Sequence, residues 1–260
     1  MSASQQALLH LEDVSIRFGG LVAVQGLTLS VQEGAIAGLI GPNGAGKTTV
    51  FNMITGQYVP TSGAIYFGGQ AIHGWPPHRV AALGIARTFQ NIRLFRDLSV
   101  LENVLVGLHL RRKTGVAATL FGTLSRRREE SAMHEEALAL LESVGLLGYL
   151  HERAGALPYG QQRRLEIARA LATRPRLLLL DEPAAGMNPE EMRQLTEFVR
   201  QVRERHRLTI LLIEHHMQMV MEICEQITVL DYGVAIAEGP PQRIQQDPRV
   251  IAAYLGEEPA

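Results

Sequence analysis

Residues 157–183 read LPYGQQRRLEIARALATRPRLLLLDEP, which joins a glycine-glutamine turn, a basic helix and an apolar strand that ends in two carboxylates. Residues 41–48 read GPNGAGKT and match the GxxxxGK[ST] pattern of a phosphate-binding loop in full. Ala35–Ile40, just before this loop, reads as a buried strand, and Lys47–Thr55 reads as a helix. Together the two stretches predict that the chain binds ATP at one place and presents a second phosphate-facing turn at another.

The composition is that of an ordinary globular protein. The 260 residues are 46% hydrophobic and 20% charged, and the formal net charge of −1 gives no electrostatic case for nucleic acid as a partner. Cys224 is the only cysteine, which fits a reducing compartment. The N-terminus lacks a signal-peptide pattern, and no apolar run approaches the ~20 residues that span a bilayer. We therefore expect a cytoplasmic protein that reaches the inner face of the membrane only through a partner.

The order of apolar patterns predicts an α/β fold. Leu8–Val31 alternates around Gly19-Gly20, which indicates antiparallel strands, whereas helical periodicity appears at Val100–Leu110 and Ser131–Val144. We expect a P-loop NTPase (RecA-like) fold: a mostly parallel sheet core with an N-terminal antiparallel β part and an inserted helical subdomain. The other predicted elements are strands Ala64–Phe67, Leu177–Asp181, Thr209–Ile213 and Ile227–Asp231, and helices Glu190–His206 and Met217–Ile223.

The predicted organisation is a single ATP-binding domain over residues 1–260. Residues 1–86 and 173–260 are expected to form the β subdomain and the catalytic core. Residues 87–172 are expected to form the helical subdomain, which carries the glycine-glutamine turn.

The phosphate-binding loop predicts the nucleotide contacts. Its glycines give the backbone the freedom to turn several N–H groups toward one anion, and the helix that follows adds its positive end. Lys47 is expected to act as a catalytic residue that reaches the β- and γ-phosphates, and the Thr48 hydroxyl is expected to ligate Mg²⁺. The predicted nucleotide-binding residues of this loop are Gly41, Pro42, Asn43, Gly44, Ala45, Gly46, Lys47, Thr48 and Thr49.

The carboxylate pair ends the strand of four leucines. Asp181 and Glu182 would lie at the carboxyl end of a central strand, where open α/β sheets bind ligands. Asp181 is expected to hold the Mg²⁺ shell, and Glu182 is expected to be the catalytic residue that polarises the attacking water. Two solvated acids at a strand end would be the weaker interpretation beside a complete phosphate-binding loop.

The motifs as a set resemble those of the ATP-binding subunit of an ABC transporter over nearly the full length of the chain. Gln90 in RTFQN resembles the Q-loop of that family, and PYGQQ at residues 158–162 resembles its signature, commonly LSGGQ. His215 in LLIEHH resembles the switch histidine, Ala185–Asn188 occupies the place of the D-loop, and Phe18 that of the aromatic residue that stacks on adenine. Read without the resemblance, Gln90 would be a polar residue after a strand and Phe18 a core residue.

The resemblance implies a shared nucleotide site. In the family two subunits face head to tail, so the signature turn of one covers the ATP bound by the other. Tyr159, Gly160 and Gln161 are therefore implied to contact nucleotide. Gln90 is implied to be a catalytic residue and a magnesium ligand, and His215 a catalytic residue at the γ-phosphate.

Three positions depart from the common family pattern. Pro158 replaces the usual signature serine and removes a hydroxyl and an N–H group, and Tyr159 stands where a first glycine is common. These two changes leave Gly160 as the main backbone donor of the turn. Asn188 replaces the usual D-loop aspartate, which removes a charge.

Four stretches closely resemble the subunits that energise bacterial import of branched-chain amino acids: YGQQRRLEIARAL at 159–171, DEPAAGMNP at 181–189, IEHHM at 213–217 and VIAAYLGE at 250–257. The resemblance implies permease subunits, a second ATP-binding subunit as an identical or related partner, and a periplasmic or extracellular substrate-binding protein. The cationic residues 111–113 and 126–128 read as a solvated face, with attraction to anionic lipid as a second interpretation. Two rival functions are a soluble ABC ATPase that acts on a nucleic-acid or protein complex, and an ATP-binding module without catalysis.

Overall fold

The computed structural model describes residues 7–109 and 123–255, with only the backbone described at residues 123–127. The predicted cationic cluster at residues 111–113 lies outside the described residues, as do the side chains of Arg126 and Arg127. The chain divides into two compact units. We call residues 1–90 with 176–260 the core unit and residues 91–175 the helical unit.

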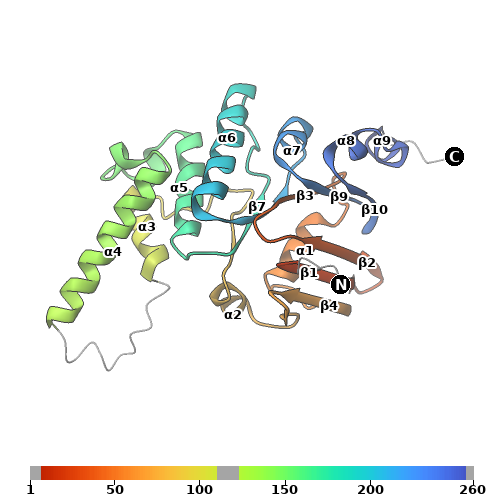
Figure 1. Ribbon diagram of the computed structural model, residues 1–260, viewed down its shortest axis with the longest axis horizontal. Helices are drawn as coiled ribbons and strands as arrows, with labels where there is room; N and C mark the ends of the chain where they lie inside the picture. Colours follow the sequence, from red (N-terminus) through yellow and green to blue (C-terminus); the bar gives the residue numbers. More distant parts are fainter. Residues whose placement is uncertain (1–6, 110–122, 256–260) are drawn as a thin grey trace, which may run out of the picture. The chain divides into compact units, whose positions relative to one another are not determined.

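A six-stranded sheet forms the centre of the core unit (Figure 1). Its order is β10-β9-β3-β8-β7-β6, and all neighbours are parallel except β9 and β10. The three strands β3, β8 and β7 are buried along their whole length, which is why they read as unbroken apolar runs. The strands are β3 (Ile36–Ile40), β6 (Ile85–Arg87), β7 (Leu177–Asp181), β8 (Thr209–Ile213), β9 (Gln226–Asp231) and β10 (Val234–Gly239).

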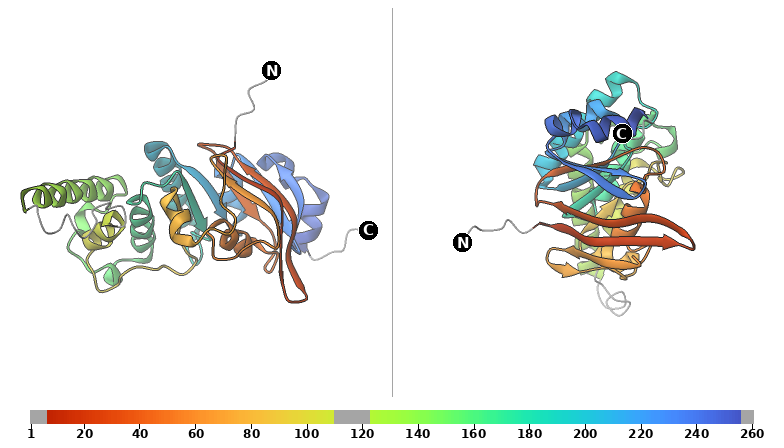
Figure 2. Two further views of the ribbon diagram at one scale, coloured as in Figure 1. Left: turned by 90° about the horizontal axis from the view of Figure 1, so that it is seen from below. Right: turned by 90° about the vertical axis from the view of Figure 1, so that its right-hand side faces the viewer.

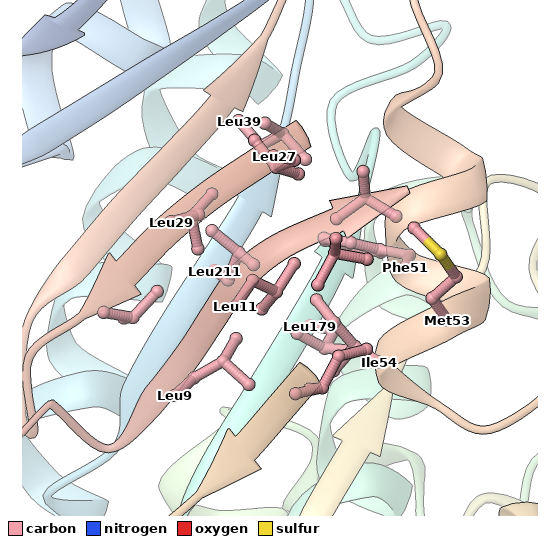
Figure 3. Packing of buried hydrophobic residues seen from close by; sticks show 14 of the residues in the cluster. Leu9, Leu11, Leu27, Leu29, Leu39, Phe51, Met53, Ile54, Leu179 and Leu211 are labelled. Carbon is pink, nitrogen blue, oxygen red and sulfur yellow. The ribbon is translucent and has the colours of Figure 1, made fainter. Parts of the chain in front are cut away.

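A second, antiparallel sheet has the order β2-β1-β4-β5 and forms a separate layer of the core unit (Figure 2). Leucines of β1 and β2 turn toward leucines of the central strands, and α1 supplies Phe51, Met53 and Ile54 to the same core (Figure 3). This packing fixes α1, and with it the loop that precedes α1, against both sheets. The strands are β1 (Leu9–Phe18), β2 (Leu21–Val31), β4 (Ser62–Phe67) and β5 (Gln70–Ala71).

Helices cover the core unit and build the helical unit. In the helical unit α3, α4 and α5 pack against one another. The core unit contains α1 (Lys47–Ile54), α2 (Pro77–Ala82), α6 (Pro189–His206), α7 (Met217–Ile223), α8 (Pro241–Gln245) and α9 (Pro248–Leu255). The helical unit contains α3 (Val100–His109), α4 (Thr123–Ser143), α5 (Tyr159–Leu171) and the short 3-10 helices η2 (Leu147–Tyr149) and η3 (Ala154–Ala156).

The predicted fold class is confirmed. The antiparallel start, the parallel sheet and the helices α1, α3, α6 and α7 occur close to where the sequence predicts them, whereas α4 begins at Thr123 and not at the predicted Ser131. The strands β5, β6 and β10 and the helices α2, α8 and α9 were not predicted; β5 and β6 hold only two and three residues, which are too few to display a period. Across the described ranges, no helix combines the length and apolar character needed to cross a bilayer.

Candidate nucleotide site

The loop that matches the phosphate-binding pattern joins β3 to α1. Gly41 adopts φ +147°, and a Cβ atom on it would lie 1.9 Å from the backbone oxygen of Leu230 in β9. Gly46 caps the start of α1 with φ 101°. Only glycine satisfies the conformation and the close approach at position 41, so contacts within the core unit explain this residue.

Lys47 is the first residue of α1, and its side chain turns back into the loop. The residue is 7% exposed, and its Nζ donates to the carbonyl oxygens of Gly41 at 2.7 Å and Pro42 at 2.8 Å. Burial lowers the pKa of Lys47, while the nearby carboxylates of Glu182 and Asp181 act to raise it. An ammonium group has three donors, so two bonds to the loop leave one donor for an anion.

Asp181 ends β7 and is held by an arginine that the sequence analysis missed. Arg87, at the end of β6, donates to Asp181 Oδ2 at 2.7 Å and to Asn52 Oδ1 of α1 at 2.7 Å. Both side chains of the ion pair are 7% exposed. Arg87 therefore ties the predicted magnesium ligand to the helix that follows the phosphate-binding loop. The only sequence signal for this role of Arg87 is its place in the motif RTFQN at residues 87–91, three positions before Gln90.

Glu182 lies between two of the other predicted catalytic residues. Gln90 Nε2 donates to Glu182 Oε2 at 2.8 Å, and His215 Nδ1 lies 3.7 Å from the same oxygen. Glu182 has φ 46°, a conformation that costs a non-glycine residue free energy and that clusters at functional sites. The structure thus brings together three residues that the sequence places after β6, β7 and β8.

Several of the remaining predicted residues of the core unit are accessible, although Ala45 in the loop is buried. Thr48 is exposed on the first turn of α1, and Thr49 beside it is half-buried. Phe18 is 45% exposed and packs edge-on against Tyr58 with ring centroids 5.1 Å apart, so Phe18 is not a core residue. Tyr58 was missed by the sequence analysis, because nothing in the order of motifs links it to Phe18.

The signature-like turn belongs to the helical unit. Tyr159 begins α5 and Gly160 and Gln161 continue its first turn, where backbone N–H groups have no carbonyl partner inside a helix. Pro158 stands at the N-cap without a side-chain cap bond. Gly160 has an ordinary φ, and a Cβ atom on it would meet nothing within 4 Å. Unlike Gly41, Gly160 has no neighbour among the described residues that requires a glycine.

A buried ion pair anchors the start of α5. Arg163 donates to Glu166 Oε2 at 2.6 Å, and the two side chains are 0% and 2% exposed. Arg163 also donates to the Tyr159 hydroxyl at 3.2 Å, and Glu166 Oε1 accepts from the backbone N–H of Arg93 at 3.2 Å. Tyr159 as a residue is 41% exposed, while its hydroxyl accepts a hydrogen bond from the buried Arg163.

Comparison with known proteins agrees with these observations. A family model for ABC transporters matches residues 24–185, and one for branched-chain amino acid ATP-binding cassette transporters matches residues 236–260. The high-affinity branched-chain amino acid transport ATP-binding protein BraF of Pseudomonas aeruginosa is 49% identical, over 96% of this chain and 98% of BraF. LivG of Escherichia coli K12, with the same description, is 48% identical over 97% of this chain and 99% of LivG. The crystal structure of the ADP conformation of MJ1267, an ATP-binding cassette of an ABC transporter, has a TM-score of 0.84 and 32% identity, covering 97% of this chain and 100% of MJ1267.

The chain belongs to the ABC transporter family. Within that family it belongs to the branched-chain amino acid group that contains LivG and BraF. It is an ABC transporter ATPase subunit, as the sequence analysis predicted.

The D-loop of this ABC protein gives Asn188 a structural task. Asn188 caps α6: its Oδ1 accepts from the N–H groups of Glu190 at 2.9 Å and Glu191 at 3.0 Å, while Glu191 Oε2 accepts from the Asn188 N–H at 2.9 Å. This reciprocal capping box uses the side-chain amide oxygen of Asn188, and a carboxylate oxygen of aspartate would cap the helix equally well. The sequence NPEE at residues 188–191 carries this capping signal.

The C-terminal part that matches the branched-chain cassette model includes α9. This helix packs against α8 and β10. Burial raises the pKa of its Tyr254.

Proposed function

We propose that the chain is the ATP-hydrolysing subunit of a bacterial importer for branched-chain or other hydrophobic amino acids. The main observation in support of ATP hydrolysis is the position of the Glu182 carboxylate just after β7. Its Oε2 lies 2.8 Å from Gln90 Nε2 and 3.7 Å from His215 Nδ1. The amino-acid substrate is supported by the transport function for which BraF and LivG are named, since both match almost end to end.

In this proposal the core unit binds ATP through the phosphate-binding loop. The residues from Gly41 to Thr49 surround the phosphates, and Lys47 uses its third donor on a β- or γ-phosphate oxygen. Phe18, with Tyr58 against its edge, offers an exposed aromatic face to the adenine ring.

The residues also fit a magnesium ion, which prefers hard oxygen ligands. Thr48 offers an exposed hydroxyl, and Asp181 keeps its second carboxylate oxygen beyond the one bonded to Arg87. Gln90 donates through Nε2, so its amide oxygen is the atom that would face a metal. When bound, the ion neutralises charge on the β- and γ-phosphate oxygens.

Hydrolysis requires that a water be held in line with the γ-phosphorus. Glu182 accepts a proton from this water while the water oxygen bonds to the γ-phosphorus. The bond between the γ-phosphorus and the β–γ bridging oxygen breaks, which releases ADP and phosphate. Gln90 fixes the orientation of Glu182 through their hydrogen bond. His215, with 47% of its side chain exposed, is available to contact the γ-phosphate.

The signature turn supports a paired arrangement. Tyr159, Gly160 and Gln161 begin α5 in the helical unit, and nothing in the described part of the chain requires Gly160 to be glycine. A nucleotide held by a second ATP-binding subunit, identical or related, would explain why position 160 is a glycine, because the nucleotide would lie against its backbone. The other proposed partners are membrane permease subunits and a periplasmic or extracellular substrate-binding protein, which place this chain on the cytoplasmic face of the membrane.

Substitution of Glu182→Gln tests the catalytic part of the proposal. Loss of the proton acceptor should lower the maximal rate of ATP hydrolysis about 100-fold or more, with the affinity for a fluorescent ATP analogue unchanged. Glu222→Gln on α7 is the matched control, because it makes the same change at an exposed side chain and should leave both quantities unaltered. Normal turnover by the Glu182 variant would remove Glu182 from its role.

The transport part needs the chain in its own membrane. A tagged chain purified from cells with ATP and Mg²⁺ should recover permease subunits and a second ATP-binding subunit. Cells that lack the chain should lose uptake of branched-chain amino acids. Recovery of ribosomal or DNA-associated proteins instead would favour the soluble ABC ATPase and contradict the importer.

A further inference from the structure

Glu214 is a fully buried carboxylate that none of the steps above uses. It follows β8, and its side chain is 0% exposed. Its two oxygens receive backbone N–H groups from two different loops. Oε1 accepts from Ala184 at 2.8 Å, whereas Oε2 accepts from His215 at 2.9 Å and from His216 at 3.0 Å.

Each of these loops carries a residue of the proposed catalytic set. Ala184 follows Glu182 by one intervening residue, and its N–H group is held on one side of the carboxylate. His215 is held on the other side by its own N–H group. The His215 ring stands between two carboxylates, with Nδ1 3.7 Å from Glu182 Oε2 and 3.8 Å from Glu214 Oε2. One side chain therefore bridges the loops of the water-polarising residue and of the switch histidine.

His216 completes this bridge. Its Nδ1 lies 3.0 Å from Glu214 Oε2, and its ring packs against that of His215 with centroids 4.1 Å apart. His216 is also the N-cap residue of α7. The Glu214 carboxylate thus orients the His216 ring, and the His216 ring packs against the His215 ring.

We propose that Glu214 is a positioning residue for ATP hydrolysis, which holds the Glu182 loop and the His215 loop at a fixed separation. A carboxylate suits this task because it offers only acceptors, and both of its oxygens face N–H donors. A glutamine has nearly the same shape, but its NH₂ group would face a backbone N–H group of one of the two loops. Two donors cannot form a hydrogen bond with each other. The inference rests on the proposed roles of Glu182 and His215.

Glu214, His215 and His216 also have the residue types of a metal site. Ligand atoms of Glu214, His215 and His216 lie within 4.8 Å of one another. Oε2 of Glu214 already accepts three hydrogen bonds, two from backbone and one from the His216 ring, and Oε1 accepts one from Ala184. The buried carboxylate is therefore satisfied by N–H donors, and the bridging role accounts for all of them.

The test compares Glu214→Gln, Glu182→Gln and the control Glu222→Gln in the purified full-length chain. The measured quantities are the maximal rate and the KM for ATP, the affinity for a fluorescent ATP analogue, and hydrogen exchange of the peptides that span residues 182–188 and 214–217. For Glu214→Gln we expect a loss of at least tenfold in maximal rate and an affinity within twofold of the unmodified chain. Exchange should become faster in those two peptides and stay unchanged in the peptide that spans residues 41–48.

Two outcomes would overturn the inference. A maximal rate within twofold of the unmodified chain would show that the bridge does not position catalytic groups. Nucleotide affinity that falls together with the rate, with faster exchange throughout the core unit, would show a general structural role. Glu214→Asp keeps two acceptor oxygens on a shorter stem, and it should recover more rate than Glu214→Gln. Full turnover by Glu182→Gln would contradict the catalytic role of Glu182 in the proposed function. Full turnover by Glu214→Gln, with turnover lost in Glu182→Gln, would contradict only the positioning role of Glu214.

Discussion

The phosphate-binding loop leads into α1 and the signature turn forms the start of α5, and both contain glycine, yet the surroundings of the two glycines differ. In the loop, Gly41 is enclosed: a Cβ atom there would lie 1.9 Å from a β9 carbonyl oxygen. In the turn, Gly160 has ordinary backbone geometry and open space around the position of a Cβ atom. The first glycine is required by the fold, and we infer that the second is required by a ligand outside the fold.

The supporting residues differ in the same way. Lys47 is buried and donates to the carbonyls of its own loop, so the loop is preformed by the core unit. The signature turn instead has an exposed tyrosine ring over a buried ion pair between Arg163 and Glu166. A rigid base with an open outer surface is the expected design of a turn that meets its ligand on another subunit. Substitutions in the loop, under the turn and in the D-loop test how far this difference extends.

The largest effect on stability is expected for Gly41→Ala. The new methyl group would overlap the Leu230 oxygen at a φ of +147°, so we expect a loss of about 3 kcal/mol or more in the free energy of unfolding. Gly44→Ala is the matched control, because φ there is +83° but nothing lies within 4 Å, and it should cost only about 1–2 kcal/mol. Denaturant unfolding measures both, and equal losses would show that close packing at Gly41 is unimportant.

The next effect concerns the base of the signature turn. Arg163→Met leaves Glu166 buried without its cation, which we expect to cost about 3 kcal/mol of unfolding free energy. The double variant Arg163→Met with Glu166→Leu removes both charges and should lose less than the single variant. Chemical denaturation of the unmodified chain and the two variants decides the point, and a double variant at least as unstable as Arg163→Met alone would refute the ion-pair account.

The smallest effect concerns the D-loop. Asn188→Ala removes the cap of α6 and should cost about 1 kcal/mol, measured by thermal or denaturant unfolding. Asn188→Asp keeps a capping oxygen and adds a negative charge at a helix N-terminus, so its stability should equal or exceed that of the unmodified chain. A destabilised aspartate variant would mean that Asn188 contributes something other than its cap.

The sequence predicted the site best where motif and topology coincide. Glu182 and His215 follow two predicted parallel strands, β7 and β8, and the carboxyl ends of such strands meet at one edge of the sheet. Their proximity could therefore be expected from the sequence, whereas the strand before Gln90, β6, was not predicted. Asn188 could also have been identified as a helix cap from the sequence NPEE at residues 188–191.

The buried charges could not be predicted. Arg87 and Asp181 are 94 positions apart, and only the pairing of β6 with β7 brings them together. Arg163 stands in the pair Arg163-Arg164 within a basic helix, a pattern that ordinarily predicts a solvated face. Glu214 follows the apolar word TILLI and reads as a polar strand end. Arg163 and Glu214 have partners nearby in the sequence, but their burial depends on how the helix and the strand end pack in the fold.

We infer from the difference between the two glycines that Gly160 serves a nucleotide outside its own subunit, and Gly160→Ala is the direct test. The unfolding temperature and the ATP-hydrolysis rate should be measured beside those of Gly148→Ala, an exposed position of the helical unit with nothing within 4 Å of its added Cβ. We predict that both variants keep the unfolding temperature, while only Gly160→Ala loses hydrolysis, by tenfold or more. Full hydrolysis by Gly160→Ala, or a fall in its unfolding temperature, would contradict a role toward a second subunit.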